Sequence, residues 1–267
     1  MSRIAAAFAA ARDRGRAAFV PYLTVGDPSP EGTVRFARAL VAAGADVLEL
    51  GVPFSDPIAD GPVLQRSAQR ALRAGVRLRD VFEVARRIRE ESDVALLLFS
   101  YLNPLLRVGA GVAARAAKRA GIDGVLVTDM PPEEAEPLRR VFRAALLDTV
   151  FLVAPTSPPA RMRRAARMST GFLYVVSRAG TTGARRGLPA GLAPTIRRAR
   201  RAAGGLPVAV GFGIASPAAA AAAARLADGV VVGSALVAAA ERARGDPVAA
   251  MARLARSLSS ACRKVGR

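Results

Sequence analysis

The sequence predicts a (β/α)8 barrel, the TIM-barrel architecture, that occupies residues 1–267 as a single domain. Short apolar runs rich in Val and Leu alternate with longer stretches of helical periodicity along the chain. Eight such runs occur, each followed by a helical stretch. Their spacing is roughly the thirty or so residues of a βαβ unit. A doubly wound open sheet is the alternative, but no Rossmann-type phosphate fingerprint follows the first run.

The predicted strands are short apolar runs that glycine, proline or polar residues bring to an end. They cover residues 18–24, 47–51, 94–99, 124–128, 149–153, 172–176, 208–211 and 230–233. An extra N-terminal helix precedes the first strand, with Ile4 and Phe8 facing the domain.

The helix after the first strand begins at the Pro- and Ser-containing segment 27–31, which is a start signal, and ends near Gly44. The later helical stretches cover residues 64–72, 80–90, 107–120, 132–145, 159–168, 193–203, 217–226 and 235–258. The last stretch is broken at Gly245-Asp246-Pro247. We therefore expect extra helices after the second and eighth strands.

The composition is that of a globular protein, with 52% hydrophobic and 23% charged residues. No apolar run is long enough to span a bilayer, and the N-terminus lacks the pattern of a secretory signal. Cys262 is the only cysteine, so no intrachain disulfide can form. These features predict a cytoplasmic protein without membrane contact.

The net charge of +19 comes almost entirely from arginine. A basic balance can indicate nucleic acid or acidic partners. Here the arginines are spread over many segments of the sequence, and aromatic residues make up only 5%. We therefore expect solvated helix faces and no nucleic-acid partner, which leaves the charge without a function.

Two absences restrict the chemistry. The chain has no histidine, which excludes a Ser-His-Asp triad and histidine metal sites. Neither lysine, Lys118 or Lys264, lies at a strand end, so a Schiff-base mechanism has no good candidate. We expect no metal site, and proton transfer must come from Asp, Glu or Tyr.

Two carboxylates occur in unlike settings at the second strand. Side chains alternate faces along a strand, so Glu49 shares a face with Val47 and is opposite Leu48 and Leu50. A carboxylate on an apolar face is costly, and we expect its pKa to be raised. Asp60 lies on the following loop, where a ligand can reach it. The pair suits acid and base roles, but a salt-bridged glutamate before an ordinary acidic loop explains this stretch equally well.

Glycines after the last two strands predict a phosphate site. The segments Gly211-Phe212-Gly213-Ile214 and Gly233-Ser234 would let backbone N–H groups approach an anion, and a helix N-terminus adds a favourable field. Loops in this position commonly bind phosphate in such barrels. Together with Gly183 and the two carboxylates, they indicate an acid/base lyase or isomerase acting on a phosphorylated small molecule.

The segment from Leu48 to Pro62, LELGVPFSDPIADGP, closely resembles the α subunits of tryptophan synthase. The segments PYLTVGDP at 21–28, SRAGTTG at 177–183, GFGI at 211–214 and GSA at 233–235 match that family in the same order and spacing. The resemblance covers nearly the whole chain.

The resemblance implies retro-aldol cleavage of indole-3-glycerol phosphate to indole and D-glyceraldehyde 3-phosphate. Glu49 matches the acid/base that acts on the ring carbon and the side-chain hydroxyl, Asp60 the group that faces the ring N–H, and Tyr174 a supporting group near the glutamate. The indole ring is itself the electron sink. Tyr22 and Thr182 match the ring pocket and the lid over it. The matching phosphate-binding residues are Gly183, Phe212, Gly213, Gly233 and Ser234.

The resemblance also implies a partner. A pyridoxal-phosphate β subunit would receive indole and make L-tryptophan from serine in an α2β2 heterotetramer, and this chain would need no cofactor. The candidate contacts are Pro53, Asp56, Asn103, Asp129, Pro131 and Pro132, which are otherwise ordinary turn residues. Three alternatives are a stand-alone indole-glycerol-phosphate lyase, a sugar-phosphate isomerase, and a basic RNA-binding protein, which would need a clustered basic face.

Overall fold

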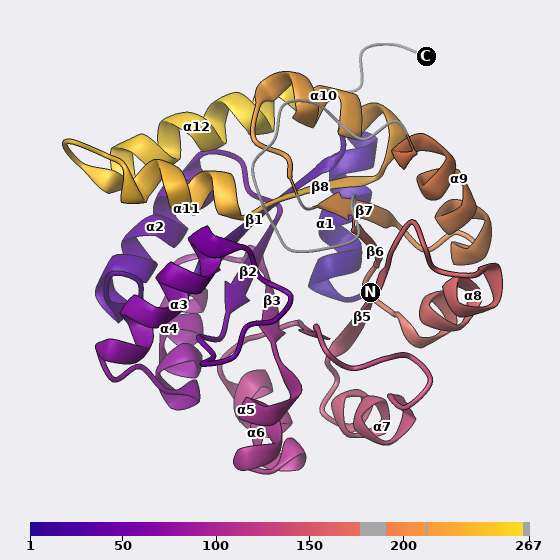
Figure 1. The fold of residues 1–267 in the computed structure, drawn as a ribbon, viewed down its shortest axis with the longest axis horizontal. Helices are drawn as coiled ribbons and strands as arrows, with labels where there is room; N and C mark the ends of the chain where they lie inside the picture. The colour runs from indigo at the N-terminus through magenta and orange to yellow at the C-terminus, as the bar shows by residue number, and fades with distance from the viewer. Residues whose placement is uncertain (177–190, 212, 264–267) are drawn as a thin grey trace.

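Eight parallel strands close into a barrel in the order β1 to β8, and helices surround it (Figure 1). The computed structural model describes residues 1–176, 191–211 and 213–263. The predicted (β/α)8 architecture is confirmed. The strands are β1 (Ala18–Thr24), β2 (Val47–Gly51), β3 (Ala95–Ser100), β4 (Gly124–Val127), β5 (Asp148–Val153), β6 (Leu173–Val176), β7 (Val208–Gly211) and β8 (Gly229–Val232).

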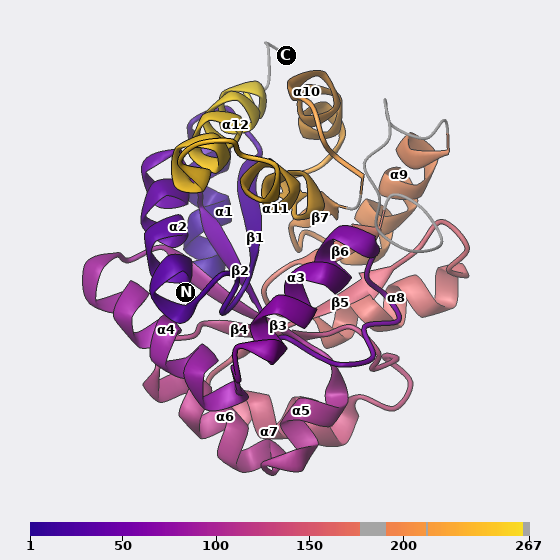
Figure 2. The same ribbon diagram turned by 60° about the vertical axis from the view of Figure 1, so that its left-hand side comes forward.

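The helices lie outside the strands, as Figures 1 and 2 show from two directions. They are α1 (Arg3–Asp13), α2 (Pro30–Ala42), α3 (Pro62–Arg73), α4 (Leu78–Glu91), α5 (Leu102–Arg107), α6 (Ala110–Arg119), α7 (Glu136–Ala144), α8 (Pro159–Met168), α9 (Leu192–Ala203), α10 (Pro217–Leu226), α11 (Ser234–Glu241) and α12 (Pro247–Ala261). The extra helices predicted at the N-terminus, after β2 and after β8 are present as α1, α3 and α11. None of the described helices is both long and apolar enough to cross a membrane.

Two helix predictions were wrong in detail. The helix predicted over 107–120 is α6, which begins later, at Ala110, and the short helix α5 before it, which begins at Leu102, was not predicted. Gly109 separates them with φ of +86°, a conformation that glycine adopts without strain. Pro104 lies in the first turn of α5, where proline is tolerated.

The helix after β4 begins at Glu136 rather than at 132. Pro137 is the reason, because its missing N–H could not bond to the carbonyl of residue 133 in a helix that began four residues earlier. Pro137 therefore fits only in the first turn of α7, and the preceding residues form turns.

The strands separate two apolar cores. On β2, Leu48 and Leu50 point outward and pack with the helices, whereas Val47 points into the barrel. This is the alternation that the sequence predicts for a strand. Glu49 must therefore share the barrel interior with Val47, which places its carboxyl among apolar side chains.

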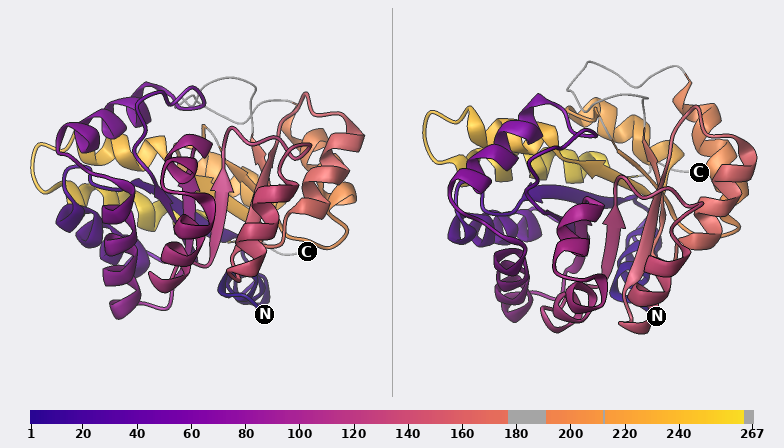
Figure 3. Two further views of the ribbon diagram at one scale, coloured as in Figure 1. Left: turned by 90° about the horizontal axis from the view of Figure 1, so that it is seen from below. Right: turned by 60° about the horizontal axis from the view of Figure 1, so that its bottom comes forward.

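Helix α1 covers the N-terminal end of the barrel (Figure 3). Ile4 and Phe8 on α1 are buried, as the sequence predicts, and the ring of Phe8 packs on that of Phe172 with 5.1 Å between centroids. The β8 residue Gly229 leaves room for this ring, since an added Cβ would lie 2.8 Å from Phe8 Cε1. The C-terminal ends of the strands lie on the side of the barrel away from α1, where sites of this fold are built.

We expect Phe8→Ala to lower the free energy of unfolding by about 3–5 kcal/mol, because it removes a buried ring and leaves a cavity at the base of the barrel. Denaturant unfolding measured by circular dichroism checks this value. Arg12→Ala is the control on the same helix, since its side chain is 77% exposed, and it should change stability by about 0.5 kcal/mol or less. Equal effects of the two changes would contradict a packing role for α1.

Candidate active site

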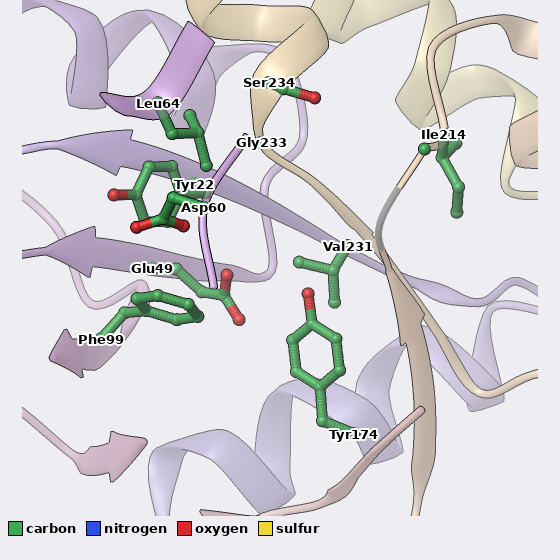
Figure 4. Close-up of a pocket in the computed structure, with 11 residues that line it drawn as sticks. Tyr22, Glu49, Asp60, Leu64, Phe99, Tyr174, Ile214, Val231, Gly233 and Ser234 are labelled. Atoms are coloured by element: carbon green, nitrogen blue, oxygen red, sulfur yellow. The ribbon is translucent and has the colours of Figure 1, made fainter. Parts of the chain in front are cut away.

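Glu49 points into the mouth of the barrel from β2 and is 1% exposed (Figure 4). Within the described residues, its Oε1 atom has no hydrogen-bond partner. Burial disfavours the charged carboxylate and raises the pKa of Glu49 to about 8. The expected direction of the pKa is confirmed, and the salt-bridged interpretation of this residue is wrong, since no ion pair to Glu49 exists in the described structure. Glu49 therefore holds a proton at neutral pH.

Asp60 lies in the same pocket but in a more polar setting. It is 6% exposed, and the hydroxyl of Tyr101 donates a hydrogen bond of 3.0 Å to its Oδ2 atom. Burial raises the pKa of Asp60 to about 6, while the bond from Tyr101 opposes this rise. The two carboxyl groups of the pocket consequently differ in charge at neutral pH, with Asp60 mainly ionised and Glu49 mainly protonated.

Tyr101 is a positioning residue that the sequence analysis missed. Its hydroxyl also accepts a hydrogen bond of 3.0 Å from the backbone N–H of Ala59, and its ring stacks on Phe54 with 4.9 Å between centroids. The end of β3 thus fixes the loop that carries Asp60. A tyrosine directly after a strand was the only sequence signal for this contact.

Two tyrosines line the pocket and each packs over a glycine at a strand end. An added Cβ on Gly51 would lie 2.0 Å from the hydroxyl oxygen of Tyr22, and one on Gly211 would lie 2.3 Å from that of Tyr174. Burial raises the pKa of both phenols, so both stay neutral. In Figure 4 the hydroxyl of Tyr174 and the carboxyl of Glu49 point into the same space.

The far side of the pocket is formed by the ends of β7 and β8. Gly213 has φ of +84°, and it lines the pocket together with Gly233 and Ser234. Gly233 is the N-cap of α11, and no side chain caps this helix end within the described structure. The first N–H groups of α11 are therefore available to an anion, as expected for a phosphate site.

Leu64 from α3, Phe99 from β3 and Val231 from β8 also line the pocket and were not predicted, and Ile214 from the predicted glycine-rich segment completes the lining. Phe99 contacts the ring of Tyr22 edge-on, with 5.3 Å between centroids. These residues look like ordinary core positions in the sequence. Three predicted site residues, Thr182, Gly183 and Phe212, lie outside the described residues.

Helix α3, which begins two residues after Asp60, is held by a polar network. The carboxylate of Asp27 accepts bonds of 2.6 Å from Ser67 Oγ and 2.8 Å from Arg70 Nε. Arg70 also bonds to Glu241 on α11 at 2.8 Å. The network links the loop after β1 to the helices that follow Asp60 and Gly233, and so supports both ends of the pocket.

The predicted partner contacts are divided by exposure. Asp56, Asn103 and Asp129 are exposed, and Pro131 is half-buried. The remaining two, Pro53 and Pro132, are buried in this chain. Asp129 also has a structural role, since its Oδ1 atom accepts a bond of 2.8 Å from the N–H of Leu102 at the start of α5.

The arrangement provides a protonated acid, a carboxylate, two neutral hydroxyls and an anion site around an apolar pocket. In the described ranges no cluster of His, Cys, Asp and Glu could hold a metal ion. These residues can transfer protons to and from a substrate that has a flat apolar group at one end and an anionic group at the other.

Comparison with known proteins agrees with this chemistry. The family model described as "Tryptophan synthase alpha chain" matches residues 8–264. The chain belongs to this family. A tryptophan synthase alpha chain from Solibacter usitatus is 53% identical over 89% of this chain and 88% of its own length, and one from Opitutus terrae is 46% identical over 96% of each. A solved tryptophan synthase structure from Mycobacterium tuberculosis superposes with a TM-score of 0.92, at 37% identity and 99% coverage of both chains.

Membership of the tryptophan synthase alpha chain family agrees with where the matching motifs lie. The longest motif, Leu48 to Pro62, runs from β2 through the Asp60 loop into α3. The motifs at 21–28 and 233–235 provide Tyr22, Asp27, Gly233 and Ser234, all of which the structure places in or behind the pocket.

We expect Tyr101→Phe to move the acidic limb of the pH–rate profile to higher pH. The change removes a bond that favours the ionised form of Asp60, and the loss of one such bond is worth about one pH unit. Steady-state cleavage assays between pH 5 and 9 check this shift. Phe54→Leu, which removes the stacking partner but keeps the hydroxyl, should leave the limb in place. An unmoved limb in Tyr101→Phe would contradict the role of Tyr101.

Proposed function

We propose that this chain catalyses the alpha reaction of tryptophan synthase, the cleavage of indole-3-glycerol phosphate to indole and D-glyceraldehyde 3-phosphate. The observation that carries the proposal is the pair of unlike carboxyl groups. The pKa of Glu49 is raised to about 8 and that of Asp60 only to about 6, so at neutral pH Glu49 carries a proton and Asp60 carries a negative charge. The reaction needs both.

The chemistry begins with the proton of Glu49. Glu49 donates it to the ring carbon that bears the glycerol side chain, and the ring becomes a cation with its charge centred on nitrogen. The ionised Asp60 faces the ring N–H and stabilises this charge. Because the ring is now an electron sink, no Schiff-base lysine is required.

The carbon–carbon bond then breaks. The Glu49 carboxylate accepts the proton of the side-chain hydroxyl, the carbon that carried it becomes the aldehyde, and the bonding electrons return to the ring. Indole is released with the donated proton on its carbon, and Glu49 regains a proton, so no net proton is consumed. Tyr174, whose hydroxyl faces the same space, acts as a supporting group (Figure 4).

Substrate binding divides between the two sides of the pocket. Tyr22 and Phe99 form an aromatic wall suited to the indole ring, and Thr182 is expected to belong to the lid. The phosphate is expected at Gly213, Gly233 and the N-terminus of α11, with Gly183 and Phe212 added by resemblance. A backbone cradle of this kind needs no cationic side chain.

A β subunit is the partner that this chain would serve, in an α2β2 assembly with pyridoxal phosphate bound in the β subunit. The surface that supports this lies at the barrel mouth, where Ile58 is 76% and Leu106 55% exposed. The Phe54–Tyr101 stack and the Asp129–Leu102 bond bring the loops after β2 and β4 to α5, close to both residues. Exposed apolar residues within a polar rim are typical of a protein interface.

Cys262 is buried and unpaired, in keeping with a cytoplasmic setting.

Indole release from indole-3-glycerol phosphate, measured with and without a β subunit, tests the proposal. Weak activity that rises strongly with the partner supports both the reaction and the complex. Strong activity that the β subunit does not change would favour the alternative, a stand-alone lyase. No activity in either condition would contradict the proposed reaction.

We expect kcat/KM to be bell-shaped, with limbs near the pKa values of about 6 for Asp60 and about 8 for Glu49. Below the first value Asp60 is protonated and cannot stabilise the ring cation, and above the second Glu49 has lost the proton it must donate. Glu49→Gln should lower kcat by about 10²–10⁴-fold and Asp60→Asn should also lower it. A pH profile unchanged by Glu49→Gln would show that another group is the acid.

We expect Leu106→Asp to weaken β-subunit binding by about tenfold or more, because it places a charge in the apolar part of the interface. Calorimetric titration measures the affinity. Leu146→Asp is the matched control, since Leu146 is 77% exposed but precedes β5 at the opposite end of the barrel. Cleavage without the partner should be unchanged in both variants. Equal binding by both would exclude α5 from the interface.

A further inference from the structure

The positive charge of this chain is concentrated in its C-terminal part. Residues 1–148 contain 21 basic and 18 acidic side chains, whereas residues 149–267 contain 19 basic and only 3 acidic ones. No acidic residue occurs between Asp148 and Asp228. Such an asymmetry between the parts of one chain indicates a surface for a polyanion more strongly than a high net charge does.

The fold places much of this charge on two neighbouring helices. α8 and α9 pack against each other on the flank of the barrel opposite α2 and α4 (Figures 1 and 2). Neither helix contains an acidic or an aromatic residue. Their arginines, which define the α8–α9 face, are Arg161, Arg163, Arg164, Arg167, Arg197, Arg198, Arg200 and Arg201.

Most of this charge is not neutralised by other residues. Arg161 pairs with Glu133 and Arg200 with Asp228. Arg164 and Arg198 donate to backbone carbonyls, which satisfies their N–H groups but leaves their charge. The other four arginines are exposed and have no acidic partner within the described residues. They are Arg163, Arg167, Arg197 and Arg201.

Helix α4 shows that this pattern is not general for arginines here. It also has several arginines, but Arg79 and Arg86 pair with acids of the same helix, and Arg87 pairs with Glu31. The α4 flank is therefore a mixed, self-compensated surface. Arginines form ion pairs on the α4 flank, whereas most arginines of the α8–α9 face have no acidic partner within the described residues.

The α8–α9 face contains a groove between the two helices. It has a volume of about 290 Å³ and is lined by Pro159, Met162, Arg163, Arg198, Arg201 and Ala202. Three guanidinium-bearing side chains therefore border one concavity, with no carboxylate in its lining. A planar guanidinium group binds the oxygens of a phosphate through paired N–H donors.

The side chains of the α8–α9 face indicate which kind of partner it can bind. None of the large apolar side chains exposed in the described part of the chain lies on α8 or α9, so the face lacks the apolar centre of a protein interface and the apolar side of a membrane-binding helix. It also has no aromatic platform for unstacked bases. A polar, strongly positive surface without these features is typical of an interface with nucleic acid.

We propose that the α8–α9 face binds the phosphate backbone of duplex nucleic acid without reading its sequence. This departs from the expectation drawn from the sequence, where the arginines look dispersed because the pairing of the two helices is not visible. The face lies on the flank, whereas the β-subunit contacts proposed above lie at the mouth, on the loops after β2 to β4. Both partners can therefore bind at once.

The test is binding of the purified full chain to a fluorescent 20-base-pair DNA duplex at several salt concentrations. Replacing the four uncompensated arginines, Arg163, Arg167, Arg197 and Arg201, by Gln should reduce the slope of log affinity against log salt by about 3 to 4, since each phosphate contact contributes about 0.9. The affinity at 0.1 M salt should fall about a hundredfold or more.

The matched control replaces Arg38, Arg79, Arg86 and Arg87, which all have acidic partners, by Gln. It removes the same number of positive charges and should leave the slope nearly unchanged. If both fourfold variants lose binding equally, net charge alone is responsible and the proposal is overturned. The same holds if the unaltered chain does not bind at 0.1 M salt, or if polyglutamate of equal charge competes as well as DNA.

Melting curves and indole-glycerol-phosphate cleavage establish that the variants remain folded, because none of these arginines lies in the pocket. If the fourfold variant does not fold, Arg163→Gln with Arg201→Gln carries the same test with an expected slope change of about 1.8. An unchanged slope in that double variant would also overturn the proposal.

Discussion

The buried carboxyl group of Glu49 is the constraint on which the site depends. An acid held inside an apolar barrel, with no hydrogen-bond partner for Oε1 in the described residues, keeps its proton to about pH 8. On a loop, such a group would turn toward water and become an ordinary carboxylate. On β2 it cannot, because the neighbouring strands fix the backbone on both sides and the period of two fixes its direction. The closed sheet therefore keeps Glu49 buried, and this burial raises its pKa so that it can act as an acid.

That same period explains how much was predictable from the sequence. Strand positions, the placement of Glu49 on the face opposite Leu48 and Leu50, and its raised pKa follow from alternation and burial, so a local pattern was enough for these features. The glycine-rich side of the pocket was also predictable in part, because Gly213, Gly233 and Ser234 lie where strands of this barrel type end. At these positions a ligand would be bound by backbone N–H groups, and the glycines that leave such groups accessible can be recognised in a sequence.

The setting of Asp60 was not predictable, because it depends on residues far away in the chain. Tyr101, 41 positions later, donates the bond that opposes the rise in its pKa. The anchoring of α3 through Asp27 and Arg70 spans 43 positions. The glycines Gly51 and Gly211 likewise show no sign in the sequence that each leaves room for a tyrosine hydroxyl from a neighbouring strand. In each case the partner is specified by the closure of the barrel, which brings strand ends together whatever their separation in sequence.

The charge of the chain cannot be explained by the site. The lining of the pocket within the described residues contains no cationic side chain, and the phosphate proposed there would be bound by backbone N–H groups. The arginines of α8 and α9 lie on the outer layer, beyond the strands, and a helix alone is about 10 Å across. At physiological ionic strength the Debye length is about 8 Å, so exposed charges at that distance contribute little inside the barrel. Their effect is largest at their own surface, and the cause of the charge asymmetry has to be sought there rather than in the binding of substrate.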